Sequence, residues 1–166
     1  MEKPVFSVRK EDFQAISGQD LVELMRGVLD KGANFQFRAK GWSIVPFIHS
    51  GDRITITPLT LEKLGISKVV AFINPTSCRL MVHRIVGKRG ETFLVHGDNE
   101  SGKPEGWVNR QYILGCVTQV NRNGRRVFLG LGPERALLAF FTRQGWFVTI
   151  LRKFKAIKRI LLRKTN

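Results

Sequence analysis

The sequence predicts a mainly β domain of the α+β class, and three patterns along the chain lead to this prediction. A helix-like segment comes first, a long stretch of short strand-like runs follows, and a second helical pattern comes last. With 166 residues the chain is long enough for one domain with a substantial core. We therefore expect an N-terminal helix and entry segment over 1–34, a β-rich domain over 35–132, and a basic amphipathic helical region over 133–166.

The first segment carries apolar residues at the spacing of one helix face. These residues are Leu21, Leu24, Met25, Val28 and Leu29. Ser17 and Asp20 provide a start signal, because a serine hydroxyl can accept a hydrogen bond from the backbone of the first helical turn. Gly32 provides a stop signal. The pattern predicts one amphipathic helix before the β-rich domain.

The central stretch predicts strands, because short alternating or apolar runs are separated by turn residues. The runs are 35–39, 53–57, 68–73, 80–86, 92–95, 112–120 and 125–129. Asn123-Gly124, between the last two runs, is typical of a tight β-hairpin, since both residues tolerate a positive φ. We expect a mostly antiparallel, coiled sheet.

The charge of the chain is strongly positive and unevenly distributed. The formal net charge is +15, and residues 133–166 hold nine of the 28 Lys and Arg residues but only one acidic residue, Glu134. Helical patterns run over 136–141 and 147–162, with apolar residues on one face and cations on the others. We favour a helix in an anionic membrane interface, because aromatics and cations are both dense here. The alternative is a terminal helix that packs on the β-rich domain.

The composition excludes several other classes of protein. The chain is 43% hydrophobic and 25% charged, which is typical of a globular protein rather than a disordered or fibrous one. No run approaches the ~18 apolar residues of a membrane span. Residues 1–10 lack the apolar core of a secretory signal. Cys78 and Cys116 have no paired spacing, so we expect two reduced, buried thiols.

A serine and a histidine are the candidate catalytic residues. Ser43 follows a strand-like run and precedes Pro46, which stops regular structure and leaves the hydroxyl exposed at a rigid turn. A serine nucleophile needs a base within hydrogen-bond reach. His83 lies between Met81 and Ile85 on the face that a strand buries, where desolvation favours a neutral imidazole that can accept a proton. Each residue alone also has a structural interpretation, as a turn serine and a core histidine.

Three motifs in order carry a more specific signal. They are Gly-x-Ser-x-x-Pro-x-Ile-x-x-Gly-Asp over 41–52, His-Arg-Ile-Val-Gly over 83–87 and Gly-Asp-Asn over 97–99. This order resembles the boxes of the type I signal peptidase family, in the histidine-base version of the endoplasmic-reticulum and archaeal enzymes. The resemblance implies a coiled antiparallel β-domain of signal-peptidase type. It also implies that Ser43 attacks the scissile carbonyl, that His83 is the general base, and that nearby backbone N–H groups form the oxyanion hole.

The resemblance further implies a carboxylate that supports the imidazole. We expect Asp98 in this role, with Glu105 as its rival, because the histidine version carries a second aspartate after the Gly-Asp-Asn box. Turn capping is the structural alternative for Asp98. Asp52 is expected to cap the turn that fixes the serine segment. Ile44 stands where the family usually has methionine, which alters the shape of the pocket wall.

We expect no metal and no cofactor. His49 and His96 form no ligand spacing with the other histidines or the cysteines. The glycine-rich segments 87–90 and 130–132 lack the strand-to-helix context of a phosphate loop, so they are interpreted as turns.

The expected partner is a peptide or pre-protein substrate, bound as an added strand along the edge of the active site. Family members are ordinarily anchored by an N-terminal membrane span that this sequence lacks. We therefore expect a stand-alone, cytoplasmic form that is peripherally associated with an anionic membrane surface through 133–166. A relation to self-cleaving repressors is disfavoured, because they use a lysine base.

Two alternatives stay open. One is a basic nucleic-acid-binding module, suggested by the charge together with Trp42, Trp107 and Trp146. The lack of a recognisable nucleic-acid motif disfavours it. The other is a catalytically inactive relative that binds peptides without cutting them.

Overall fold

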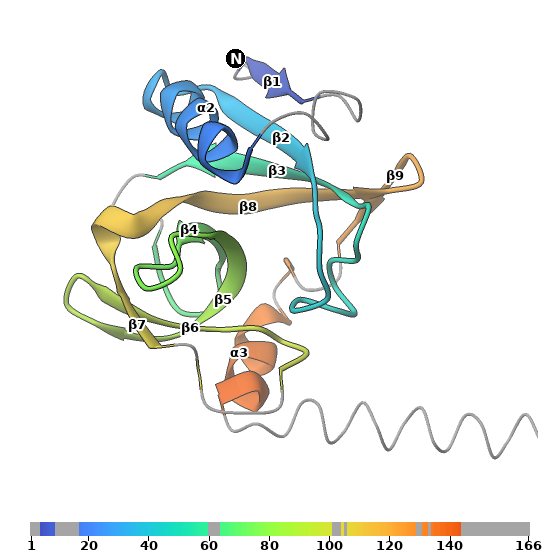
Figure 1. The fold of residues 1–166 in the computed structure, drawn as a ribbon. Helices are drawn as coiled ribbons and strands as arrows, with labels where there is room; N and C mark the ends of the chain where they lie inside the picture. The colour runs from blue at the N-terminus through green and yellow to red at the C-terminus, as the bar shows by residue number, and fades with distance from the viewer. Residues whose placement is uncertain are drawn as a thin grey trace, which may run out of the picture.

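The computed structural model describes residues 4–8, 17–59, 64–100, 104, 106–128, 131–132 and 134–143. These residues form one sheet of nine strands, two α-helices and one short 3-10 helix, which confirms the predicted mainly β class (Figure 1). The strands are β1 (Val5–Ser7), β2 (Asn34–Arg38), β3 (Arg53–Pro58), β4 (Val69–Ile73), β5 (Leu80–Arg89), β6 (Thr92–His96), β7 (Gly106–Asn109), β8 (Ile113–Arg122) and β9 (Arg125–Val127). The helices are α2 (Gly18–Asp30), η2 (Arg110–Tyr112) and α3 (Arg135–Arg143).

The sheet is antiparallel apart from one edge. Its strand order is β1-β2-β3-β8-β4-β5-β6-β7, with β9 also paired to β8, and only β1 runs parallel to its neighbour β2. Register shifts interrupt the ladders at 55/56 in β3, at 71/72 in β4 and at 85–87 in β5. Such irregularities bend a strand and increase its twist. The sheet accordingly coils, with β4 and β5 curling beneath the long strand β8 (Figure 1).

Helix α2 begins and ends where the sequence predicts. The Ser17 hydroxyl accepts a hydrogen bond from the Asp20 N–H at 3.2 Å and so caps the first turn. The helix is followed by Gly32, whose φ of +76° lies in the left-handed region that glycine adopts at little cost. The buried face consists of Leu21, Met25 and Leu29. This face joins β2, β3 and β8 in one hydrophobic cluster, so the entry segment shares its core with the sheet.

The predicted strand runs correspond to β2–β6, β8 and β9, with small shifts of their ends. The predicted hairpin is confirmed as well. Arg122 pairs with Arg125 across a two-residue turn, and Asn123 and Gly124 have φ values of +51° and +77°. Positive φ at both central residues is the requirement of the type I′ turn, whose twist matches that of the flanking strands.

The sequence pattern does not predict β1 or β7. All three residues of β1 are exposed, and Val108 is the one buried residue of β7. A strand of three or four residues that is mostly exposed carries no alternation of apolar and polar positions. β1 and β7 form because β2 and β6 offer them backbone hydrogen bonds. A local sequence pattern does not reveal such pairing.

Helix α3 confirms the helical pattern predicted over 136–141, and it packs against β5 (Figure 1). Ala139 and Thr142 are buried, whereas Leu137 and Phe140 are exposed. The remainder of the basic region, 144–166, lies outside the described residues, as does the membrane-interface helix expected there. No helix in the described part of the chain is long and apolar enough to cross a membrane.

The prediction of two buried thiols is only half correct. Cys116 lies buried in β8, but Cys78 is exposed, and both are free thiols. Cys78 belongs to the turn between β4 and β5, where its φ is +54°. The Asn74 side chain organises this turn by accepting the N–H groups of Thr76 and Ser77. Cys78 therefore lies in the turn, outside the apolar strands on either side of it.

Candidate active site

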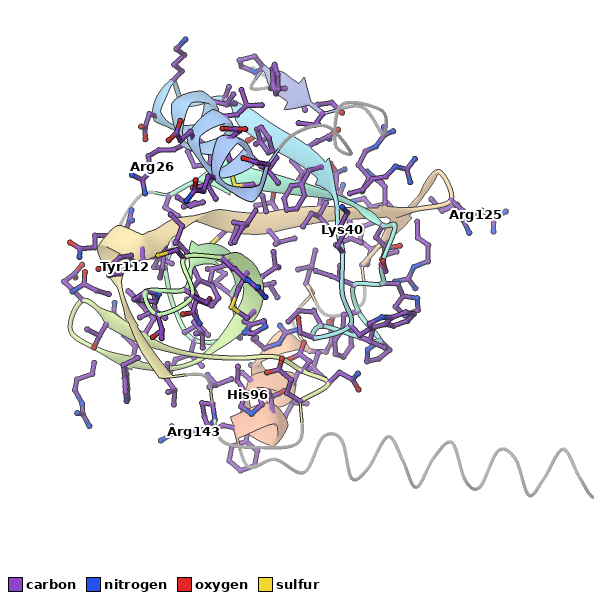
Figure 2. The ribbon with its side chains drawn as sticks, viewed as in Figure 1. Arg26, Lys40, His96, Tyr112, Arg125 and Arg143 are labelled. Atoms are coloured by element: carbon purple, nitrogen blue, oxygen red, sulfur yellow. The ribbon has the colours of Figure 1, made fainter. Side chains whose placement is uncertain are left out.

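Ser43 and His83, which are far apart in the sequence, line the same pocket. The pocket has a volume of about 730 Å³ and is bordered by the start of α2, the end of β2, the segment 41–48 and the start of β5. Apolar side chains, among them Ile44 and Met81, form much of its wall. Lys40, which Figure 2 shows where the chain leaves β2, also lines it. The structure thus brings the predicted nucleophile and the predicted base to one cavity.

The segment 41–48, here called the serine segment, is closed at its base and anchored in the core. The Ala39 N–H donates to the Asp52 carbonyl at 2.8 Å, and the Gly51 N–H donates to the Ala39 carbonyl at 2.9 Å. Three of its side chains are buried in the same cluster as helix α2, namely Ile44, Phe47 and Ile48. Ser43 itself is half-buried at the pocket. A short loop fixed at both its base and its apolar side holds the serine with little freedom.

Asp52 has the structural role that the sequence predicts. Its carboxylate accepts the His49 N–H at 2.8 Å and three hydrogen bonds from Arg122 at 2.9, 3.3 and 2.7 Å. Arg122 also donates to the Phe47 carbonyl at 3.2 Å, which ties the serine segment to β8. Burial alone would raise the pKa of Asp52, but the hydrogen bonds from Arg122 and the His49 N–H outweigh it and lower the pKa. The carboxylate therefore stays ionised as a fixed cap.

His83 lies in the middle of β5, paired with Val70 of β4, and is only 1% exposed. The Phe72 ring and the imidazole pack in a T-shaped arrangement at a centroid distance of 5.7 Å. Burial is the main reason that the pKa of His83 falls to about 4, and the charge of nearby His96 lowers it further. At neutral pH the imidazole is uncharged, which is the state required of a general base.

Asp98 is held by Arg84 in a buried ion pair. The Arg84 Nε donates to Oδ1 at 2.8 Å and Nη2 donates to Oδ2 at 2.7 Å, and both side chains are fully buried. The Thr142 hydroxyl of α3 adds a hydrogen bond to Oδ1 at 3.1 Å. With its oxygens used in this way, Asp98 joins β5, the turn after β6 and α3. These contacts are with Arg84 and Thr142 and not with the imidazole, so they support a structural role for Asp98, and its expected role in supporting His83 stays a prediction.

The turn that carries Asp98 also contacts the serine segment. The Asn99 N–H donates to the Ser43 carbonyl at 2.8 Å. A Cβ added at Gly97 would lie 2.9 Å from the same carbonyl oxygen and 2.7 Å from Cδ of Glu100, so only glycine allows this approach. The Gly-Asp-Asn box, the serine segment and the strand of His83 therefore meet at one place.

Glu100 is a site residue that the sequence reasoning missed. Its Oε1 lies 3.7 Å from Nε2 of His83, which is beyond hydrogen-bond length but close enough to stabilise a protonated imidazole. Its side chain is 39% exposed. The available signal was its place directly after the Gly-Asp-Asn box, on a turn that faces the histidine strand. Glu105, the expected rival of Asp98, lies outside the described residues.

The other histidines have local structural roles. His96, at the end of β6, is buried, and its Nδ1 lies 2.6 Å from the Gly97 carbonyl. His49 contributes its backbone N–H to the Asp52 cap. Within the described ranges, no group of three or more His, Cys, Asp or Glu side chains is placed to hold a metal ion.

In comparisons with known proteins, no family model matches this chain and no curated protein is significantly similar to it.

A pair of carboxylate-to-amide substitutions separates the roles of Asp98 and Glu100. Asp98→Asn should lower the free energy of unfolding by about 3 kcal/mol or more, because it leaves the buried Arg84 charge uncompensated. Glu100→Gln should change it by less than about 0.5 kcal/mol, because the side chain is partly exposed. Urea denaturation followed by circular dichroism measures both. Equal effects of the two substitutions would contradict the structural role of Asp98.

The buried imidazole makes stability depend on pH. Its pKa is lower in the folded protein, at about 4, than the ordinary value of 6.5, so between these pH values the unfolded chain binds more protons. The free energy of unfolding should therefore rise with pH across this window, and His83 should account for about 3 kcal/mol of the rise. In His83→Gln this part of the rise should disappear.

Denaturant titrations at several pH values from 4 to 7 test this prediction. Met81→Gln is the matched control, because it places the same side chain on the same strand without removing a titrating group. It should retain the wild-type pH dependence. A slope in His83→Gln as steep as that of the wild type would show that the imidazole does not lose its charge on folding.

Proposed function

We propose that this protein is a serine endopeptidase of the signal-peptidase type, with Ser43 as nucleophile and His83 as general base. The observation that carries the proposal is the common pocket of a half-buried serine on an anchored loop and a histidine kept neutral by burial. The order of the three sequence motifs supports the same proposal, since Ser43 and His83 of the first two boxes line this pocket and Asn99 of the third is hydrogen-bonded to the Ser43 carbonyl.

The chemistry follows from the two side chains. The Ser43 Oγ forms a bond to the carbonyl carbon of the peptide, and its proton passes to the His83 imidazole. The imidazolium then gives that proton to the leaving amine as the C–N bond breaks. Water, deprotonated by the same imidazole, hydrolyses the acyl-enzyme and frees the serine. Backbone N–H groups at Ser43 and the following residue are the proposed donors to the oxyanion.

We assign Glu100 the role of stabilising the imidazolium during this cycle. An ionised carboxylate 3.7 Å from Nε2 favours the charged imidazole, and it is placed to do so when the proton is transferred. Asp98 acts through Arg84, as a positioning residue for β5 and the turn that carries Glu100. In this proposal Glu100 and Asp98 together take the role that the family resemblance assigns to a single aspartate.

The pocket favours an extended, apolar peptide substrate. Its walls combine apolar side chains with the beginning of strand β5, along which a peptide can be aligned. Leader and signal-type peptides with small residues near the scissile bond are the proposed substrates. Peripheral association with an anionic membrane is part of the proposal, on the strength of the cations in 133–166.

Cleavage of such peptides tests the proposal. Purified protein should cut at least one member of a set of leader and signal peptides, with products identified by mass spectrometry. Ser43→Ala and His83→Ala should each lower kcat/KM by about a thousandfold or more. Glu100→Gln should lower it by roughly tenfold, because the imidazolium loses a nearby opposite charge.

Matched controls are available on the exposed surface. Ser7→Ala in β1 and Glu91→Gln in the turn after β5 make the same chemical changes away from the pocket, and they should retain wild-type rates. Cleavage that persists in both Ser43→Ala and His83→Ala would refute the assignment. Binding of the peptides without cleavage in any variant would instead identify an inactive peptide-binding relative.

A further inference from the structure

A second groove lies at the other end of the loop that carries Ser43, and most of its surface is polar. It has a volume of about 700 Å³ and is bordered by the end of β2, the segment 49–53, the end of β8 and the Asn123-Gly124 turn. None of the residues that line it has an apolar side chain. Whatever occupies such a groove is hydrophilic, in contrast to a ligand of the apolar pocket that contains Ser43 and His83.

The strand register places like charges side by side at this groove. Arg38 of β2 lies directly opposite Arg53 of β3, and Arg53 lies opposite Asn121 of β8. Asn121 in turn lies opposite Arg126 of β9, so the four residues form one row across the ends of four strands. We call the groove lined by Arg38, the segment 49–53 and the segment 121–124 the arginine groove; Arg126 extends the row beyond this lining. Directly opposed like charges in a sheet are destabilising, and an anion placed beside them would supply compensation for this repulsion.

The one carboxylate in the described lining of the groove does not supply that compensation. Asp52 is bound by Arg122 through hydrogen bonds of 2.9 and 2.7 Å. Arg38 donates to the Gly51 carbonyl at 3.0 Å, which is a neutral acceptor. Arg38 and Arg53 are both exposed. The groove therefore presents at least two guanidinium groups whose charge is not balanced by the lining.

We propose that the arginine groove binds a phosphate-type oxyanion, either a phosphate ester or free phosphate. Guanidinium groups present fixed pairs of N–H donors that match the oxygens of phosphate, and several arginines from different strands suit a group with oxygens on all sides. The absence of apolar side chains excludes a ligand held by hydrophobic contact. The volume leaves room for the alcohol portion of an ester beside the phosphate.

The proposal goes beyond the peptidase function and does not depend on it. The groove begins at His49, directly after the serine segment, and it shares no lining residue with the pocket that contains Ser43 and His83. A phospholipid headgroup and a soluble phosphate share the required chemistry. They differ in whether the phosphate must be presented on a membrane surface, and the experiment separates them on that basis.

Direct binding measurements on the full chain test the proposal. The probes are inorganic phosphate and glycerol phosphate, followed by calorimetry, and vesicles of phosphatidylcholine with or without phosphatidylglycerol, followed by flotation. The double variant Arg38→Gln/Arg53→Gln should weaken binding of the productive probe by roughly tenfold or more. The matched control is Arg26→Gln/Lys31→Gln, which removes two exposed cations from the region of α2 and should bind as the wild type does.

We expect the double variant Arg38→Gln/Arg53→Gln to fold, so that weaker binding reports on the groove and not on unfolding. Removing two opposed charges should leave the Tm of Arg38→Gln/Arg53→Gln unchanged or slightly raised at low salt. Binding of the soluble phosphates that depends on Arg38 and Arg53 supports the proposal with free phosphate as the source. Binding only to vesicles with phosphatidylglycerol, with the same dependence, supports it with a lipid headgroup as the source.

Two results would overturn the proposal. One is equal affinity of the double variant and its matched control for every probe, since the groove would then contribute nothing. The other is a DNA oligonucleotide that binds through these arginines while soluble phosphates and vesicles do not, which would identify a nucleic-acid surface instead. Because none of these measurements requires peptide cleavage, failure of the groove proposal is distinguishable from failure of the peptidase proposal.

Discussion

The buried ion pair between Arg84 and Asp98 is the interaction on which the geometry of the candidate site depends. Two opposite charges removed from water are tolerated only when each is fully paired and hydrogen-bonded. Arg84 meets this demand by binding Asp98, the Ser67 carbonyl at 2.9 Å and the face of the Phe47 ring. The single guanidinium thus touches the serine segment, the turn after β6 and the loop before β4.

The position of His83 follows from this arrangement. His83 directly precedes Arg84 in β5, so a strand fixed at the arginine also fixes the histidine. The same ion pair fixes the turn that carries Glu100, and this turn is joined to Ser43 by the Asn99 hydrogen bond. Three segments that are distant in sequence therefore form one rigid unit. In this unit the His83 imidazole is buried and uncharged at neutral pH. The same burial makes the free energy of unfolding depend on pH and keeps the imidazole able to accept a proton.

Much of the fold and part of the site follow from local sequence patterns. Helix α2 and most of the strands carry their own periodicity, and Asn123-Gly124 between two strand-like runs favours a tight hairpin turn. Ser43 and His83 are predicted as candidates because ordered motifs surround them, and the structure places both residues at one pocket. The role of Asp98 was not predictable, because its partner Arg84 comes from another strand and the sequence gives no register. Glu100 was missed for the same reason, since its distance to His83 depends on the coiling of the sheet. The arginine row likewise exists only through strand pairing.

The proposed peptidase activity requires the Ser43 hydroxyl to be a nucleophile and the His83 imidazole to be its base. Reaction with a diaryl phosphonate, followed by intact-protein and peptide mass spectrometry, measures this requirement. The Ser43 Oγ should form a bond to phosphorus with loss of one phenol, giving a single adduct at Ser43, and His83→Ala should slow this reaction by about a hundredfold or more. The absence of an adduct, adducts spread over several serines, or an unchanged rate in His83→Ala would contradict the claim.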